Sequence, residues 1–235
     1  MKKLQLINSD TSKNIYKSDR EGQLIIEFLD DNPFKKGKKK KIPPRGECNN
    51  SVSALLFEYL ESYHVTTYFI KKSDAKEMIV KDYEIIPIKI IIRNIATGTL
   101  CKTYGIPEGK ILEYPVIEYY LKDLKRHDPL LNEYHIYALN YANPEEMKTI
   151  SRISSKVNAI LKSFFKRRNL KLVDMKLEFG RIKGKITICD EITPETFRIW
   201  DELTDERYDF EIMEKRPNTA EQIYKTIMEK MNILK

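Results

Sequence analysis

Residues 172–180 read Leu-Val-Asp-Met-Lys-Leu-Glu-Phe-Gly and alternate between apolar and charged side chains. Because side chains of a strand point to two faces in turn, this stretch predicts a strand with Asp174, Lys176 and Glu178 on one face. The apolar side chains would then lie on the other face. A solvated edge strand could show the same pattern, so the residues that follow have to decide between the two.

A second alternating run, residues 185–191, follows a turn that contains Gly184. Two such runs around a glycine turn predict a β-hairpin. If the numbers of paired residues add to an even total, Glu178 and Asp190 share a face, whereas a shift of one residue separates them. On one face they would form an oxygen-only site suited to Mg²⁺ and phosphates. Lys176 beside them would suit the charge of a phosphoryl group in transfer.

Composition limits the class of protein. A chain of 235 residues can bury one large core or two modest ones, and its 41% apolar and 33% charged content is ordinary for a soluble globular protein. We find no apolar run of membrane-spanning length and no signal-peptide core at the start, so we expect no membrane partner. Cys48, Cys101 and Cys189 form no Cys-x-x-Cys motif, which favours reduced thiols in the cytoplasm.

The net charge of +7 raises the question of nucleic acid, because many of the excess lysines lie in residues 35–41. No aromatic residues interleave with these lysines, so nucleic-acid binding is disfavoured. A solvated loop between prolines is the simplest interpretation. A loop that closes over nucleotide phosphates is the alternative.

The first half of the chain predicts strands over residues 24–28 and 77–81, with a helix over 51–63 between them. Residues 85–92 predict a buried strand with Pro87 near its start or at a bulge. Arg93 and Asn94 follow, then a glycine turn that ends at Thr99. This segment could bind an anion, or it could be a satisfied turn with Arg93 at the surface.

The second half predicts one long helix that begins at Pro144, with Asn143 as its N-cap, and a last helix over residues 219–233. The fold class is therefore α+β. We expect a small β-rich lobe over residues 1–84, a larger mixed lobe over 85–235, and a ligand cleft between them.

The quoted stretch resembles the signature of the SAICAR synthetase (phosphoribosylaminoimidazole-succinocarboxamide synthase) family. Further motifs of that family occur in the same order along the chain. They are Asn14-Ile15-Tyr16, Gly46-Glu47-Cys48-Asn49-Asn50, and the segments 91–99, 127–133, 190–195 and 198–200. Together they span almost the whole chain.

The resemblance implies a carbon–nitrogen ligase of de novo purine biosynthesis. Such an enzyme condenses the carboxylate of CAIR, 5-amino-1-(5-phosphoribosyl)imidazole-4-carboxylate, with the amine of L-aspartate. ATP and magnesium convert the carboxylate into an acyl phosphate, and the products are SAICAR, ADP and phosphate. The resemblance also implies a SAICAR synthase-like fold related to ATP-grasp and kinase lobes, an ATP cleft between the lobes, and a homodimer.

The resemblance assigns roles to individual residues of this chain. Glu178 and Asp190 would hold the metal and ATP phosphates, Lys13 and Lys81 would contact the nucleotide phosphates, and the backbone from Glu84 to Ile86 would meet the adenine. Arg93, Thr99 and Arg198 would bind the sugar phosphate. Asp174, Lys176 and Glu178 would be catalytic, with the first two against the imidazole and its activated carboxylate. Lys122 and Asp128 would line the aspartate or substrate pocket.

Several positions depart from the family pattern. Asp10-Thr11-Ser12-Lys13 replaces Gly-Lys-Ala-Lys, so Asp10 would repel a triphosphate unless it turns away or binds metal. Lys89 stands where glutamate is usual, and Glu195 replaces aspartate. An active but divergent synthetase is the simplest explanation. A relative that joins another carboxylate and amine, and a nucleotide-binding protein without turnover, are the alternatives.

Overall fold

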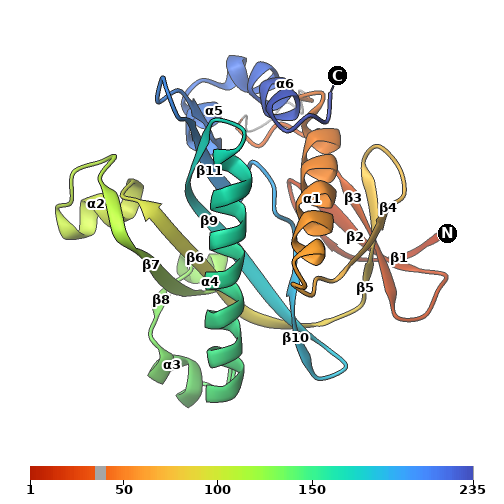
Figure 1. Cartoon of the computed structure of the whole chain (residues 1–235). Helices are drawn as coiled ribbons and strands as arrows, with labels where there is room; N and C mark the ends of the chain where they lie inside the picture. Colours follow the sequence, from red (N-terminus) through yellow and green to blue (C-terminus); the bar gives the residue numbers. More distant parts are fainter. Residues whose placement is uncertain (35–40, 235) are drawn as a thin grey trace. The chain divides into compact units, whose positions relative to one another are not determined.

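The computed structural model describes residues 1–34 and 41–234, which form two compact units. The first unit comprises Met1–Tyr83, Glu191–Glu195 and Tyr208–Lys235, and the second comprises Glu84–Asp190 and Thr196–Arg207. Each unit combines a sheet with helices, so the fold is α+β as the sequence predicts (Figure 1). Most of the lysine-rich stretch, residues 35–40, lies outside the described residues, and its suggested roles stay predictions.

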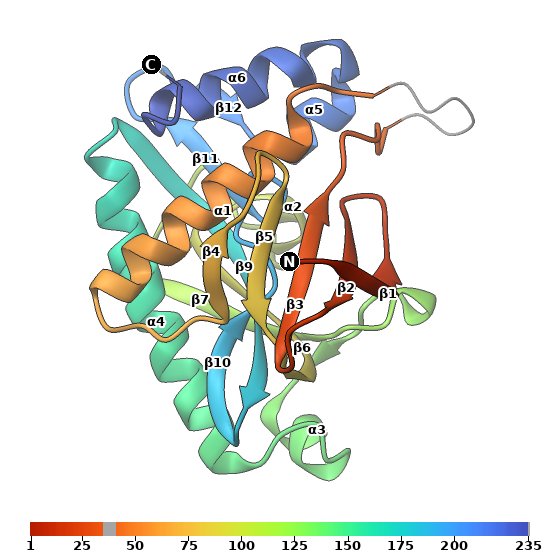
Figure 2. The ribbon, with the colours of Figure 1, turned by 90° about the vertical axis from the view of Figure 1, so that its right-hand side faces the viewer.

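The first unit contains a five-stranded antiparallel sheet in the order β1-β2-β3-β5-β4. Its strands are β1 (Lys3–Ser9), β2 (Lys13–Ser18), β3 (Gln23–Phe28), β4 (Phe69–Lys72) and β5 (Glu77–Lys81). Its helices are α1 (Arg45–Ser62), α5 (Phe210–Lys215), the short 3-10 helix η2 (Pro217–Thr219) and α6 (Ala220–Lys230). Helix α1 packs on β3, β4 and β5 and also contacts α6, and Figure 2 shows it crossing behind β4 and β5.

Helix α1 begins earlier than predicted, at Arg45 instead of Ser51. Its first turns bury polar side chains, with Arg45, Asn49 and Asn50 no more than 1% exposed. Hydrophobic spacing cannot detect a helical turn that is buried through polar groups, which explains the missed residues. The two predicted strands of this unit and the last helix are confirmed as β3, β5 and α6.

The second unit contains a seven-stranded sheet in the order β12-β11-β9-β6-β7-β8, with β10 paired to β9 outside this path. Its strands are β6 (Glu84–Ile95), β7 (Ile111–Leu121), β8 (Leu130–Leu131), β9 (Leu170–Ile182), β10 (Lys185–Cys189), β11 (Phe197–Asp201) and β12 (Arg207–Tyr208). Its helices are α2 (Gly98–Tyr104), η1 (Leu124–Arg126), α3 (Glu133–Ala138) and α4 (Pro144–Lys166). Helix α4 packs on β6, β9 and β10.

Residues 172–180 lie in β9, which is inside the sheet between β6 and β11. The solvated-edge alternative is therefore wrong. Strand β6 has its pairing irregularity between Ile85 and Lys89, which confirms a bulge around Pro87. Helix α4 begins at Pro144, as predicted. The Asn143 side chain accepts a hydrogen bond from the Glu146 backbone N–H, and the Glu146 carboxylate accepts one from the Asn143 backbone N–H.

Candidate active site

One face of the second unit's sheet is polar and the other is apolar. Directly opposed residues of an antiparallel pair share a face, and β6 and β9 oppose Lys89 with Glu178, Ile91 with Lys176, and Arg93 with Asp174. The intervening side chains are at most 1% exposed and belong to the core: Ile88, Ile90, Ile92, Val173, Met175 and Leu177. The alternation in residues 172–180 thus does place the three charged residues of β9 on a common face, as predicted.

Two arginines converge on Asp174 at one end of this polar face. The Arg198 Nε lies 2.9 Å from Asp174 Oδ1, and the Arg93 Nη1 lies 3.4 Å from Asp174 Oδ2. Arg93 also donates to Thr99 Oγ1 at 3.0 Å and, through Nε, to Glu118 Oε2 at 2.7 Å. Arg93 is only 3% exposed, so the alternative that places it at the surface is wrong. Two guanidinium groups this close together form a potential phosphate site.

The register of the β9–β10 hairpin differs from the even pairing on which the predicted carboxylate pair depended. Glu178 lies opposite Cys189, so the pairing sum is odd and that premise is wrong. Asp190, however, follows the last residue of β10 and has a left-handed backbone with φ of 63°. Regular alternation therefore ends before Asp190, so the Asp190 side chain can point to the same side as Glu178.

The two carboxylates do meet, because the same two lysines contact both of them. Lys122 Nζ lies 2.5 Å from Glu178 Oε2 and 3.8 Å from Asp190 Oδ2. Lys176 Nζ lies 2.9 Å from Glu178 Oε1 and 3.9 Å from Asp190 Oδ2. Burial by itself would lower the pKa of Lys122, but the charges of Glu178 and Asp190 outweigh it and raise that pKa.

This carboxylate pair fits a magnesium ion only with help from a ligand. Among residues 1–34 and 41–234, no group of three or more His, Cys, Asp or Glu side chains is arranged to hold a metal. Mg²⁺ in proteins commonly uses one or two carboxylates and completes its shell with water and substrate phosphates. Glu178 and Asp190 suit that pattern, and their negative charge is balanced here by Lys122 and Lys176.

Asp128 and Lys89 form an ion pair on the same polar face. The other oxygen of Asp128, Oδ1, accepts the backbone N–H of Asp123 at 2.8 Å. Asp128 therefore closes the loop that begins at Lys122 and ties it to β6. Glu84 pairs with Arg181 at 2.9 Å, and the Ile86 side chain is fully buried.

The remaining predicted nucleotide residues lie in the first unit. Lys13 is 5% exposed and forms an ion pair with Glu191, and Lys81 donates to the Thr67 carbonyl at 3.0 Å. The Asp10 carboxylate is turned onto its own loop, where it accepts the backbone N–H of Ser12 at 2.6 Å and of Lys13 at 2.9 Å. Burial would raise the pKa of Asp10, but the hydrogen bonds from Ser12 outweigh burial and lower it.

Comparisons with known proteins decide the family. The family model described as SAICAR synthetase matches residues 7–231. The chain belongs to the SAICAR synthetase family. A phosphoribosylaminoimidazole-succinocarboxamide synthase of Thermoanaerobacter sp. is 40% identical over 232 residues, covering 98% of this chain and 99% of that protein. One of Clostridium kluyveri is 37% identical over 233 residues and covers 99% of each chain.

Solved structures agree with these sequence matches. The crystal structure of phosphoribosylaminoimidazole-succinocarboxamide synthase from Ehrlichia chaffeensis has a TM-score of 0.92 at 31% identity, and it covers 98% of this chain and 100% of that one. A SAICAR synthetase in complex with ADP has a TM-score of 0.91 at 34% identity, covering 97% of this chain and 98% of that one. The similarity therefore extends over whole chains.

Several charged residues with buried or paired side chains were not found from the sequence. Glu118 accepts a hydrogen bond from the Arg93 guanidinium group, and Glu191 forms an ion pair with Lys13. Arg45 is the largest fully buried polar side chain among the described residues. Glu118 could have been found from its place in an alternating strand, since it lies opposite Ile91 on the polar face. Arg45 gave no signal, because its position precedes the apolar spacing of α1.

Among the described residues, none of the helices combines the length and the apolar character that crossing a bilayer needs.

Proposed function

We propose that this chain condenses CAIR with L-aspartate at the expense of ATP and releases SAICAR, ADP and phosphate. The observation that carries the proposal is the polar face of the second unit's sheet. A pair of arginines lies at one end and a pair of carboxylates between lysines at the other. Arg93 and Lys89, four positions apart on β6, span about 13 Å along the strand. That length suits a nucleotide with a phosphate at one end and a carboxylate at the other.

The chemistry requires activation of a carboxylate. An amine does not displace oxide from a carboxylate, so a carboxylate oxygen first attacks the γ-phosphorus of ATP and ADP leaves. The aspartate nitrogen then attacks the acyl carbon, a proton leaves the nitrogen, and the carbon–oxygen bond to phosphate breaks. The contribution of the protein is to position the reactants and to balance their charges.

We assign the sugar phosphate to Arg93, Thr99 and Arg198. Asp174 accepts hydrogen bonds from both guanidinium groups and Glu118 accepts one from Arg93, so these carboxylates would orient the two arginines. Lys176 would face the carboxylate as it becomes an acyl phosphate, with Asp174 against the imidazole. Lys122 and Asp128 would line the aspartate or substrate pocket. Once its ion pair with Glu178 breaks, Lys122 can contact an anion there.

We assign the magnesium to Glu178 and Asp190, with the nucleotide phosphates completing its coordination. When bound, the metal supplies charge neutralisation for the triphosphate. For the metal to bind, the ammonium groups of Lys122 and Lys176 have to give up part of their contact with these carboxylates. Lys13 and Lys81 are assigned to the nucleotide phosphates, and the backbone from Glu84 to Ile86 to the adenine. Residues 1–84 would thus form the nucleotide-binding lobe, and residues 85–235 would carry the metal and substrate sites.

We also propose that the chain forms a homodimer in the cytoplasm. Large apolar side chains of the second unit support self-association, since Ile111 and Tyr114 are 73% and 77% exposed. The three cysteines are free thiols, which suits a reducing compartment. Light scattering coupled to gel filtration tests the dimer directly.

The experiment that tests the proposed function is an assay of ADP release by the purified protein with Mg-ATP, CAIR and aspartate. We expect ADP release only when all three substrates are present, and loss of turnover in Glu178→Gln. Turnover with another carboxylate or amine but not with CAIR and aspartate would favour a divergent relative. ATP binding without consumption would favour a nucleotide-binding protein without turnover. Either result would contradict the proposal.

A further inference from the structure

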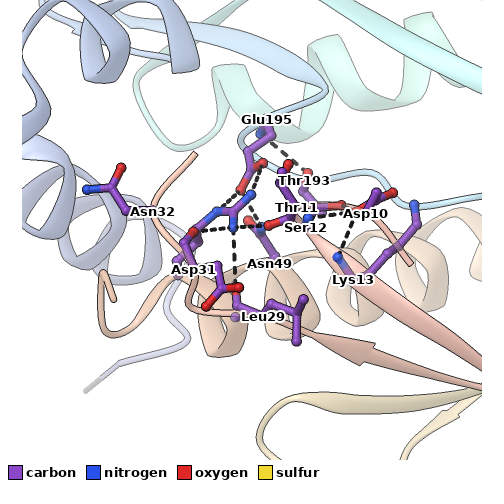
Figure 3. A network of polar contacts seen from close by, with 12 residues as sticks. Asp10, Thr11, Ser12, Lys13, Leu29, Asp31, Asn32, Asn49, Thr193 and Glu195 are labelled. Atoms are coloured by element: carbon purple, nitrogen blue, oxygen red, sulfur yellow. Dashed lines mark hydrogen bonds and ion pairs between the residues drawn. The ribbon is translucent and has the colours of Figure 1, made fainter. Parts of the chain in front are cut away.

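Arg45 is a fully buried cation at the start of α1, and none of the roles assigned above uses it. A charge removed from water is costly unless it is paired and hydrogen-bonded. The guanidinium group contacts Glu195, Thr11 and Asp31, which are labelled in the network of polar contacts in Figure 3. These contacts hold the guanidinium group of Arg45 in one position.

The guanidinium group of Arg45 forms a two-point ion pair with Glu195. Nε lies 2.8 Å from Oε1, and Nη2 lies 2.8 Å from Oε2. The Oε1 atom also accepts from Asn49 Nδ2 at 2.6 Å and from the Tyr224 hydroxyl at 2.9 Å. Burial would lower the pKa of Arg45, but hydrogen bonds to Glu195 and its charge raise it, so the group remains a cation.

The third nitrogen of Arg45 binds the backbone of two loops. Nη1 donates to the Thr11 carbonyl at 2.6 Å and to the Asp31 carbonyl at 2.6 Å. Thr11 lies in the Asp10–Lys13 turn, and Ser12 of the same turn accepts the backbone N–H of Leu29 at 2.8 Å. One side chain therefore anchors the turn that precedes Lys13, the segment after β3 and the Glu191–Glu195 segment.

Both partners of the Lys13–Glu191 ion pair thus depend on Arg45. The Thr11 contact fixes the turn that leads into Lys13, and the Glu195 contact fixes the segment that begins at Glu191. The backbone next to Arg45 is also held in place. Gly46 donates its N–H to Asp30 Oδ1 at 2.8 Å, and a Cβ on Gly46 would lie only 2.8 Å from the Phe28 carbonyl oxygen. The start of α1 therefore has little freedom to shift.

We propose that Arg45 is a positioning residue for nucleotide binding, which holds the Asp10–Lys13 turn and the Glu191–Glu195 segment so that Lys13 is presented to the nucleotide phosphates. The proposal rests on the proposed function, because that assigns Lys13 to ATP. It adds a residue that makes no contact with ligand itself. A lysine could keep the charge but not the planar set of donors that reaches Glu195, Thr11 and Asp31 together.

The test compares Arg45→Lys with the wild-type protein in steady-state kinetics and in calorimetric titration with Mg-ADP. We expect the KM for ATP and the Kd for ADP to rise about tenfold, the factor expected when one hydrogen bond to a charged group is lost. The KM values for CAIR and aspartate should stay within twofold. The matched control is Arg207→Lys, which alters an ion pair with Glu108 outside the proposed site and should leave all these constants unchanged.

A second variant covers the case in which Arg45→Lys does not fold. Glu195→Gln keeps the shape of the side chain but removes the charge that Arg45 pairs with, and it should raise the same two nucleotide constants. Equal changes in all three KM values, or an unchanged affinity for ADP, would overturn the inference and leave Arg45 a purely structural residue. Absence of turnover in the wild-type protein would instead contradict the proposed function.

Discussion

Replacement of Lys122 by methionine should make the carboxylate pair a better metal site in the absence of nucleotide. Lys122 Nζ lies 2.5 Å from Glu178 Oε2 and 3.8 Å from Asp190 Oδ2. A divalent cation bound between these carboxylates would have to displace that ammonium group or be repelled by it. Methionine removes the competing charge while keeping an unbranched side chain of similar length.

The magnitude follows from the exposure of the two partners. The Glu178 side chain is 3% exposed, but that of Lys122 is 38% exposed, so solvent screens the pair from one side. The free energy of this contact then lies between that of a surface ion pair, under about 1 kcal/mol, and that of a charge-assisted hydrogen bond, about 1.5–3 kcal/mol. A value of about 1–2 kcal/mol corresponds to Mn²⁺ binding that is roughly 5- to 30-fold tighter.

The assay is titration of Mn²⁺, as a paramagnetic probe for magnesium, followed by the electron paramagnetic resonance signal of free Mn²⁺ without nucleotide. The matched control is Lys125→Met, which removes the same charge from an exposed position in η1 and should change the affinity less than twofold. Adding Glu178→Gln to Lys122→Met should abolish the gain. Unchanged or weaker Mn²⁺ binding in Lys122→Met, or an equal gain in the control, would refute the reasoning.

Three further predictions concern Glu118, Glu146 and the cysteines. Glu118→Leu removes the acceptor at 2.7 Å from Arg93 Nε and should raise the KM for CAIR at least tenfold without a matching rise for ATP; an unchanged KM for CAIR would contradict this. The pKa of Glu146 is lowered by hydrogen bonds from Arg181, so its stabilising contribution is present above about pH 4.5 and disappears as pH falls toward the lower folded pKa. Glu146→Gln should therefore lower the thermal midpoint at neutral pH by several degrees and converge with the wild type in acid, and a difference that grows in acid would contradict the sign. Burial raises the pKa of the Cys48 thiol, and Cys189 is also buried, so a thiol reagent should modify Cys101 first, as peptide mass spectrometry would show.

The sequence predicted the features that follow from periodicity and from local caps. The alternation of residues 172–180 located β9 and its polar face, and the Asn143 and Pro144 pattern located the start of α4. These signals are local, so they survive without knowledge of the tertiary structure. The irregular pairing around Pro87 could be predicted for the same reason, because a proline inside a strand is a local signal.

The features that were missed depend on tertiary contacts or on backbone geometry. The even register failed, yet Glu178 and Asp190 still meet, because the left-handed Asp190 ends the alternation that the prediction assumed. Such a backbone angle cannot be inferred from a period of two. The early start of α1 and the buried Arg45 were invisible because hydrophobic spacing treats a buried, paired cation as a surface residue.

The acyl phosphate is the central chemical claim, and isotope transfer tests it most directly. CAIR labelled with ¹⁸O in its carboxylate would be turned over with Mg-ATP and aspartate, and the released phosphate examined by ³¹P NMR. The proposed reaction moves one labelled oxygen from the carboxylate into phosphate for each SAICAR formed. Phosphate without the label, released alongside SAICAR, would contradict it.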